Sequence, residues 1–263
     1  MGVVNVTPDS FSDGGRYLDP EAAIAHGLSL RAAGAHLLDV GGESTRPGAQ
    51  RVAPELEQER VLPVVRALAE AGASVSIDTM HASTACAAVD AGAVVVNDVS
   101  GGLADPDMLA AVAETRADIV LCHWRGHSAD MYARARYDDV VADVRSELAE
   151  RVQAAAASGI APSRVIVDPN FGFGKKGDQN WAVLRGLPKL VAMGPRVLVG
   201  TSRKKFLAEM LEETGVEPTQ EGRDLATAMT SLLAQQAGVW GVRVHDVAAT
   251  RLALTVGDRG GRP

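Results

Sequence analysis

Residues 21–40, EAAIAHGLSLRAAGAHLLDV, contain one complete structural unit of this chain. Small and apolar residues recur at helical spacing over residues 21–34, and Gly34 stands where a left-handed residue ends a helix. The short run HLLDV that follows is typical of a buried strand. This stretch therefore predicts a helix, a glycine stop and a strand.

The same unit recurs along the chain, with Gly72, Gly92 and Gly159 just past other helical segments. The strand-like runs are GVVNV, HLLDV, SVSID, AVVVND, DIVLCH, RVIVD, RVLVGTS and GVRVH. Alternating strands and helices predict parallel strands with right-handed crossovers. Eight such units without a linker predict an α/β fold, a closed (β/α)8 TIM barrel that forms one domain over residues 1–263, with its active site at the C-terminal ends of the strands.

Composition limits the classes of partner. The chain of 263 residues is 46% hydrophobic and only 4% aromatic, so its core must consist of Ala, Val, Leu and Ile. A net charge of −7 argues against a nucleic-acid partner, although a local cationic cluster could still bind a small anion. Cys86 and Cys122 match no zinc or disulfide pattern. The apolar runs are too short to cross a membrane. We therefore expect a soluble cytoplasmic protein with no membrane partner.

Each strand-like run closes on a polar side chain. The closing residues are Asn5, Asp39, Asp78, Asn97, His123, Asp168, Ser202 and His245. One such residue alone would be a helix cap or a strand terminus. Because the strand ends of a barrel converge on one face, eight of them predict an active site there. The long loop after Asn5 is interpreted as a flexible lid over that face.

Seven motifs at these ends carry a family resemblance. They are NVTPDSFSDGG (5–15), DVGGESTRPGA (39–49), SIDT (76–79), NDVSGG (97–102), DPNFGFGK (168–175), GTSRKKF (200–206) and RVHDV (243–247). With these motifs in this order, the chain resembles the dihydropteroate synthases of folate biosynthesis. The resemblance implies a Mg²⁺-dependent transferase that joins 6-hydroxymethyl-7,8-dihydropterin pyrophosphate to p-aminobenzoate. It also implies a homodimer formed through outer helices.

The pterin ring presents an edge of alternating hydrogen-bond donors and acceptors. A carboxylate can accept two parallel N–H bonds from such an edge, and an amide can pair with a mixed edge. Asp78, Asn97 and Asp168 are expected to line one deep pocket, and the resemblance assigns them to the pterin. It places Lys204 on the carbonyl side of the ring and Arg243 over its face.

The pyrophosphate needs cations and donors. The resemblance assigns Asn5 to Mg²⁺ and the phosphates, and Arg243 and His245 to the diphosphate. Arg243 and His245 are two residues apart, so they should face the same side of strand eight, next to strand one. Mg²⁺ keeps most of its waters, so one amide and the substrate oxygens suffice to hold it.

The second substrate needs an aromatic slot and a carboxylate anchor. The resemblance makes Ser202, at a helix N-terminus, the anchor. It lines the slot with Phe11, Thr45, Arg46, Pro47 and Phe173. Asp13 is a candidate to take the proton of the amine or to shield a cation. The predicted catalytic residues are Asp13, Asp78, Asp168, Lys204 and Arg243. We expect pyrophosphate to leave before the amine attacks.

Some features depart from this pattern. GFGKKG (172–177) matches G-x-G-x-x-G, but no acidic residue ends the next strand, so Lys175 and Lys176 are interpreted as a solvated rim. Asn170 and Phe171 replace the common Gly-Ile and should add bulk beside the benzoate slot. Cys122 replaces a common Met and should leave room in the pterin pocket, while the basic loop 124–139 has no evident role.

Two alternatives remain open. A pterin-binding methyltransferase barrel would share the pterin residues, but it has no use for ESTRPG or for SRKKF with the Arg243/His245 pair. A non-catalytic pterin-binding paralogue would bind the pterin without turnover. The presence of Asn5, Arg243 and His245 together argues against the paralogue.

Overall fold

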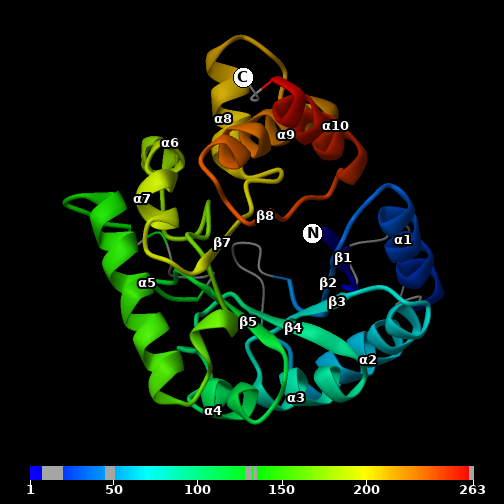
Figure 1. Cartoon of the computed structure of the whole chain (residues 1–263). Coiled ribbons are helices and arrows are strands. Elements are labelled where there is room, and N and C mark those ends of the chain that lie inside the picture. Colours follow the sequence, from blue (N-terminus) through cyan, green and yellow to red (C-terminus); the bar gives the residue numbers. More distant parts are fainter. Residues whose placement is uncertain (8–19, 45–50, 128–131, 133–134, 261–263) are drawn as a thin grey trace.

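The strands lie at the centre of the molecule and the helices surround them (Figure 1). The structure, a computed structural model, describes residues 1–7, 20–44, 51–127, 132 and 135–260. In this part of the chain, eight parallel strands pair in sequence order. They are β1 (Gly2–Asn5), β2 (Leu38–Gly41), β3 (Val75–Asp78), β4 (Ala93–Asp98), β5 (Asp118–Cys122), β6 (Val165–Asp168), β7 (Arg196–Val199) and β8 (Gly241–Val242).

The last strand returns to the first. The Val3 amide donates to the Val244 carbonyl at 3.1 Å, and Gly2 pairs with Val244 in parallel. These contacts close the sheet, which confirms the predicted α/β barrel.

Helices follow the strands as the repeated unit predicts. They are α1 (Pro20–Ala32), α2 (Pro54–Glu70), α3 (Ala82–Asp90), α4 (Met108–Ala113), α5 (Val140–Ala157), α6 (Gly177–Arg185), α7 (Leu187–Val191), α8 (Lys205–Glu213), α9 (Gln220–Gln236) and α10 (Val247–Gly260), with a 3₁₀ turn η2 (Pro162–Arg164) before β6. Gly92 shows why glycine ends these helices: its φ is +111°, and a Cβ there would lie 2.6 Å from Ala69. Among the described residues, no helix combines the length and the apolar character needed to cross a membrane.

The core has two layers, because successive strand side chains point to opposite faces of the sheet. The larger layer lies between the strands and the helices and consists mainly of Val, Leu, Ile and Ala, as the composition predicts. The smaller layer fills the interior of the barrel with Val95, Val120, Cys122, Ile166 and Leu198. Asn97 and Asp168 stand two positions after Val95 and Ile166, so they also point inward, at the carboxyl end of the barrel.

Three predicted strand ends are wrong. Asp39 lies inside β2, which continues to Gly41. Ser202 and His245 come after β7 and β8, because these strands pair with each other over only two positions. Beyond that short ladder the chain turns, with the Lys204 amide donating to the Thr201 carbonyl at 3.1 Å. Asn97 and His123 differ from the observed ends of β4 and β5 by one residue each.

Candidate active site

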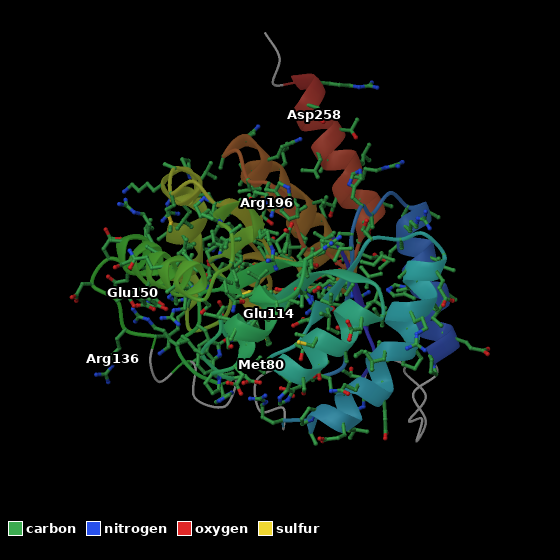
Figure 2. The ribbon with its side chains drawn as sticks, turned by 60° about the horizontal axis from the view of Figure 1, so that its bottom comes forward. Met80, Glu114, Arg136, Glu150, Arg196 and Asp258 are labelled. Carbon is green, nitrogen blue, oxygen red and sulfur yellow. The ribbon has the colours of Figure 1, made fainter. Side chains whose placement is uncertain are left out.

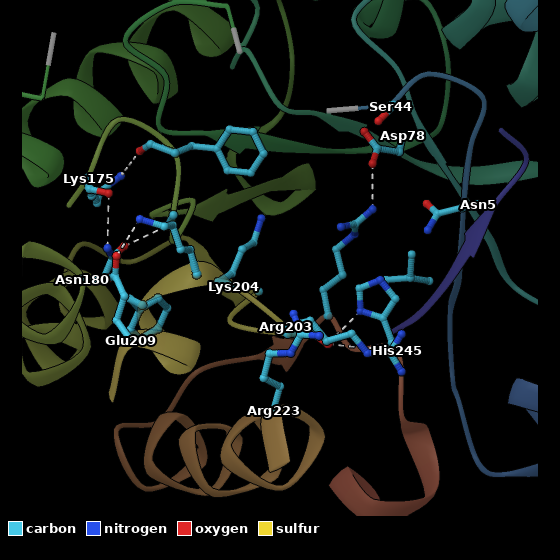
Figure 3. Close-up of a pocket in the computed structure, with 18 of the residues that line it drawn as sticks. Asn5, Ser44, Asp78, Lys175, Asn180, Arg203, Lys204, Glu209, Arg223 and His245 are labelled. Carbon is cyan, nitrogen blue, oxygen red and sulfur yellow. Dashed lines mark hydrogen bonds and ion pairs between the residues drawn. The ribbon is translucent and has the colours of Figure 1, made fainter. Parts of the chain in front are cut away.

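The carboxyl ends of the strands surround a cavity of about 1110 Å³ (Figure 3). Its lining includes seven residues predicted from the sequence: Asn5, Asp78, Phe173, Ser202, Lys204, Arg243 and His245. A narrower hollow shares several of these residues and adds the other two, Asn97 and Asp168. The structure thus brings all nine to one mouth. The remaining predicted residues, Phe11, Asp13, Thr45, Arg46 and Pro47, lie outside the described residues, as does most of the loop interpreted as a lid.

Five side chains, which we name the strand-end cluster, lie at the floor of this site: Asp39, Asp78, Asn97, Asp168 and Arg243. The ladder of neighbouring strands fixes their heights, since Asp78 pairs with Asn97 across β3 and β4. Asp168 pairs with Cys122 across β5 and β6. Because main-chain ladders hold these positions, their separation is set by the sheet itself.

Arg243 connects the two carboxylates on one side of the cluster. Its Nε donates to Asp39 Oδ2 at 2.5 Å, and its Nη2 donates to Asp78 Oδ2 at 2.7 Å. The Asn97 amide donates to the same Asp39 oxygen at 3.0 Å. The Cys122 thiol donates to Asn97 Oδ1 at 3.6 Å, which fixes the orientation of the amide. Asp39 is completely buried and therefore positions both Arg243 and Asn97.

On the other side of the cluster, Asp168 Oδ1 accepts from the backbone N–H of Asn170 at 2.6 Å. Asn170 adopts a left-handed conformation with φ of 55°, which turns the chain back over the strand end. Lys204 follows β7, the neighbour of β6 in the sheet, and its Nζ lies 4.1 Å from the centre of the Phe173 ring. Figure 3 shows Lys204 and His245 pointing into the same pocket.

Burial brings the ionisation of this cluster into the neutral range. It raises the pKa of Asp78 to about 7 against the effect of Arg243, and it raises the pKa of Asp168 to about 6. Burial and nearby Arg243 lower the pKa of Lys204 to about 8. For Arg243, burial opposes the charged form, but Asp39 and Asp78 outweigh it and raise its pKa. The cluster is therefore a poorly hydrated set of charges, in which electrostatic interactions are strong.

The other side of the cavity contains Asn5, Ser202 and His245. His245 Nδ1 lies 2.8 Å from Ser202 Oγ. Burial, together with Arg203 and Arg243, lowers the pKa of His245 to about 3. His245 is therefore neutral at pH 7 and offers a hydrogen bond rather than a positive charge. Arg243 points toward Asp39 and Asp78, so its contacts lie within the strand-end cluster.

The Asn5 side chain fits a magnesium site in which other ligands come from outside the protein. It is exposed at the end of β1, lines the cavity and makes no hydrogen bond to another described residue. Within the described chain, no group of three or more His, Cys, Asp or Glu side chains could hold a metal ion alone. An ion at Asn5 would therefore depend on substrate oxygens and water.

Two interpretations of the loop after β6 are wrong. Lys175 is 1% exposed and its Nζ contacts His123 and two carbonyls, so it is no solvated rim, whereas Lys176 is exposed as interpreted. Phe171 is fully buried and stacks on Phe206 with 6.1 Å between ring centres, so it adds no bulk to the slot. Cys122 lines the narrow hollow, as expected, and Asn170 lines it too, among residues of the strand-end cluster.

Asp39 was assigned no role from the sequence, although it stood among the polar strand residues. The signal that could have found it is the period of two: a buried acid inside a parallel strand must point into the barrel, beside other inward charges. No comparable signal exists for Lys175, because loop conformation decides its burial.

The barrel and this site define a pterin-binding enzyme, and comparisons with known proteins agree. Residues 1–245 match the pterin binding enzyme family. The dihydropteroate synthase of Mycobacterium leprae is 53% identical over 258 residues, which cover 97% of this chain and 91% of that protein. The chain belongs to the dihydropteroate synthase family, whose members are transferases of folate biosynthesis. This membership decides against the methyltransferase alternative.

Solved structures agree in fold. The Xanthomonas albilineans dihydropteroate synthase with 4-aminobenzoic acid superposes with a TM-score of 0.91 at 47% identity, covering 100% of this chain and 93% of that chain. The same enzyme in complex with 7,8-dihydropteroate gives a TM-score of 0.88 at 44% identity over the same shares. The Yersinia pestis enzyme with a sulfonamide drug gives 0.91 at 36% identity, covering 99% and 93%.

Proposed function

We propose that this chain transfers the dihydropterin methylene group from 6-hydroxymethyl-7,8-dihydropterin pyrophosphate to p-aminobenzoate, giving 7,8-dihydropteroate and pyrophosphate. The observation that carries the proposal is the strand-end cluster, with Lys204 beside it, at the floor of a cavity large enough for both substrates. Family membership and the ligands named for the Xanthomonas albilineans structures support it.

The pterin binds at the strand-end cluster. Asp78 and Asp168 accept N–H bonds from the aminopyrimidinone edge, and Asn97 pairs with a mixed position of that edge. Lys204 donates to the ring carbonyl, and Arg243 lies over the ring face. Because the two carboxylates are poorly hydrated, their interaction with a positively charged ring is strong.

The reaction is dissociative. The carbon–oxygen bond between the methylene and pyrophosphate breaks, and its electron pair leaves with the pyrophosphate oxygen. The resulting ring cation is stabilised by Asp78 and Asp168. The amine nitrogen of p-aminobenzoate then bonds to the methylene carbon and loses a proton, for which Asp13 is the proposed acceptor.

The pyrophosphate lies at the opposite side of the cavity. As a neutral imidazole, His245 donates one hydrogen bond from Nε2 while Nδ1 faces Ser202, and Asn5 would hold Mg²⁺ together with the phosphate oxygens. When bound, Mg²⁺ neutralises charge on the departing pyrophosphate. Arg243 contributes its positive charge from the pterin side.

The acceptor lies between Phe173 and Ser202. The Ser202 hydroxyl, next to His245, receives the carboxylate of p-aminobenzoate near the N-terminus of α8. Phe173 provides an aromatic face, and the remaining proposed wall residues are Phe11, Thr45, Arg46 and Pro47.

The chain forms one domain and a cytoplasmic homodimer. An apolar stripe on α9 and α10 supports the dimer; its exposed residues are Leu225, Met229, Leu233, Leu252 and Val256. In Figure 2 the end of α10, marked by Asp258, extends beyond the rest of the molecule. The free thiols Cys86 and Cys122 suit a reducing compartment.

Pyrophosphate release with both substrates and Mg²⁺ tests the proposal. We expect release that requires Mg²⁺, with formation of dihydropteroate in equal amount. Rapid mixing with the pterin substrate alone should give a burst of pyrophosphate if departure precedes attack. Pterin binding without any release would instead identify a non-catalytic paralogue, and release that waits for p-aminobenzoate would contradict the dissociative order.

A further inference from the structure

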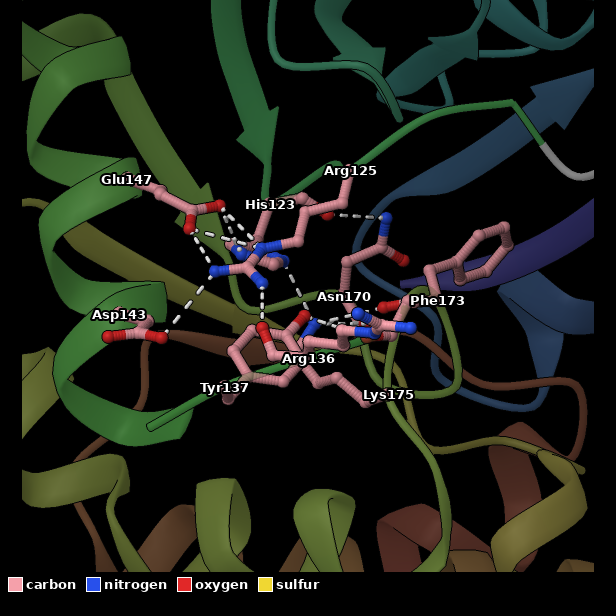
Figure 4. Close-up of polar contacts among 10 residues, drawn as sticks. His123, Arg125, Arg136, Tyr137, Asp143, Glu147, Asn170, Phe173 and Lys175 are labelled. Carbon is pink, nitrogen blue, oxygen red and sulfur yellow. Dashed lines mark hydrogen bonds and ion pairs between the residues drawn. The ribbon is translucent and has the colours of Figure 1, made fainter. Parts of the chain in front are cut away.

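The loop that follows β6, residues 169–176, which we name loop six, is held by side chains rather than by a backbone ladder. Lys175 is buried, and its Nζ lies 3.2 Å from the Asn170 carbonyl and 3.1 Å from the Phe173 carbonyl. The third neighbour of Nζ is His123 Nδ1 at 3.0 Å. One ammonium group therefore has three acceptors for its three protons, two of which belong to the same loop (Figure 4).

The proton pattern around His123 agrees with this arrangement. Since the Lys175 ammonium can only donate, His123 Nδ1 accepts from it and the neutral imidazole carries its proton on Nε2, which lies 2.9 Å from Glu147 Oε2. Burial and Lys175 lower the pKa of His123 to about 4, which keeps it neutral. Although burial opposes ionisation of Glu147, hydrogen bonds from His123 and Arg125 lower its pKa to about 2.

The basic loop 124–139, left without a role by the sequence, supplies two further donors. Tyr137 Oη donates to the Gly174 carbonyl at 2.7 Å. Tyr132 Oη donates to the Gly172 carbonyl at 2.9 Å. Arg125 covers the Tyr137 ring, with its guanidinium carbon 3.8 Å from the ring centre, and is itself bonded to Glu147.

Loop six carries two groups that face the active site. The Phe173 ring lies against Lys204 Nζ, and the backbone N–H of Asn170 donates to the Asp168 carboxylate. A change in the path of the loop would therefore move two groups together: the aromatic face of the p-aminobenzoate slot and the backbone N–H that donates to Asp168.

We propose that Lys175 and Tyr137 are positioning residues for p-aminobenzoate binding. By binding the carbonyls of loop six, they hold Phe173 as a preformed wall of the p-aminobenzoate slot. The inference rests on the proposed function, which assigns Phe173 to that slot. It gives the loop 124–139 a task, which is to support loop six from outside. Burial lowers the pKa of Lys175 to about 7, so the charged form of this lysine depends on the three groups that accept its hydrogen bonds.

Tyr137→Phe is the mildest test, since it removes one hydroxyl. We expect the KM for p-aminobenzoate to rise about threefold to tenfold, as for one lost hydrogen bond, while the KM for the pterin substrate stays within about twofold. Lys175→Met should raise the acceptor KM further, and Lys175→Arg, which keeps the charge, should recover part of the loss. Lys189→Met, at an exposed position of α7, is the control and should match the unmodified enzyme.

The split between the two KM values separates positioning from a loss of folded protein, because unfolding lowers kcat without selecting one substrate. If Lys175→Met fails to fold, Tyr137→Phe still decides. Wild-type KM values for both substrates in Tyr137→Phe would overturn the inference. Phe173→Ala separates the two proposals: if it leaves the acceptor KM unchanged, the assigned slot is wrong. If Phe173→Ala raises that KM and the Tyr137 and Lys175 variants do not, only the positioning inference fails.

Discussion

The strand-end cluster and loop six face the same cavity, but different interactions hold them. Asp78, Asn97 and Asp168 stand on strands whose ladders fix each residue against its neighbour. Loop six depends on single side-chain donors such as Lys175 and Tyr137. The comparison teaches that the strand-end cluster, where we propose that the pterin binds, is set by the barrel itself, whereas loop six, the proposed wall of the p-aminobenzoate slot, needs support from a neighbouring loop.

The largest effect should come from the strand-end cluster. Asp78→Asn removes the charge that pairs with Arg243 and that we propose accepts from the pterin. We expect kcat/KM for the pterin substrate to fall about 10³-fold, on the order of 4 kcal/mol, because charged hydrogen bonds and cation stabilisation are lost together. Initial rates of pyrophosphate release measure this. A loss below about tenfold would mean that Asp78 takes no part in the chemistry.

Asp39→Asn should have the next largest effect, since Asp39 acts through Arg243 and Asn97 rather than on the substrate. We expect a fall of about 10²-fold in kcat/KM, together with a lower Tm, because a buried pair loses one charge. Steady-state kinetics and thermal unfolding check the two effects. Unchanged kinetics with a lowered Tm would mean that Asp39 serves stability alone.

Gly172→Ala tests loop six. Gly172 has φ of +78°, and a Cβ there would lie 3.1 Å from Lys204 Cδ. We expect about a tenfold loss of activity and a cost of about 1 kcal/mol in unfolding free energy. Gly159→Ala is the matched control, because Gly159 also has positive φ (+94°) but no atom within 4 Å of its Cβ. It should lose similar stability and keep its activity; equal activity in both variants would contradict the account.

The smallest effect is the pH dependence of kcat/KM for the pterin substrate. Asp78 and Asp168 can each accept two parallel N–H bonds only when ionised, and burial raises their pKa values to about 7 and about 6, so activity should rise through this range. Lys204 must stay protonated, and burial lowers its pKa to about 8, so activity should fall above that pH. Lys204→Arg should remove the alkaline fall. A flat acid side would show that neither carboxylate titrates in the free enzyme.

The sequence was sufficient for the barrel and for most of the strand-end cluster. Asp78 and Asp168 end short buried runs, and barrel topology alone brings such ends together. The period of two points Asp39 into the barrel, but its contacts with Arg243 and Asn97 were not predictable, because only the folded chain brings these residues together. The burial of Lys175 was not predictable either, since it depends on contacts with His123, 52 residues away along the chain.

The protonation of His245 shows the same limit. Its position near the strand ends followed from the repeated unit, but its neutrality follows from burial and from Arg203, which only the folded chain brings near. Local pattern thus located the site, while charge states came from tertiary packing.

Pterin binding by Asp168→Asn tests the central claim most directly. Isothermal titration of the unmodified protein and of this variant with an unreactive pterin, at pH 8 and without p-aminobenzoate, isolates the strand-end cluster from the loops. We predict that the unmodified protein binds the pterin and that the variant binds it about 10²-fold more weakly, as for a lost charged hydrogen bond. Equal affinity in the two proteins would contradict the assignment of the pterin to the strand ends.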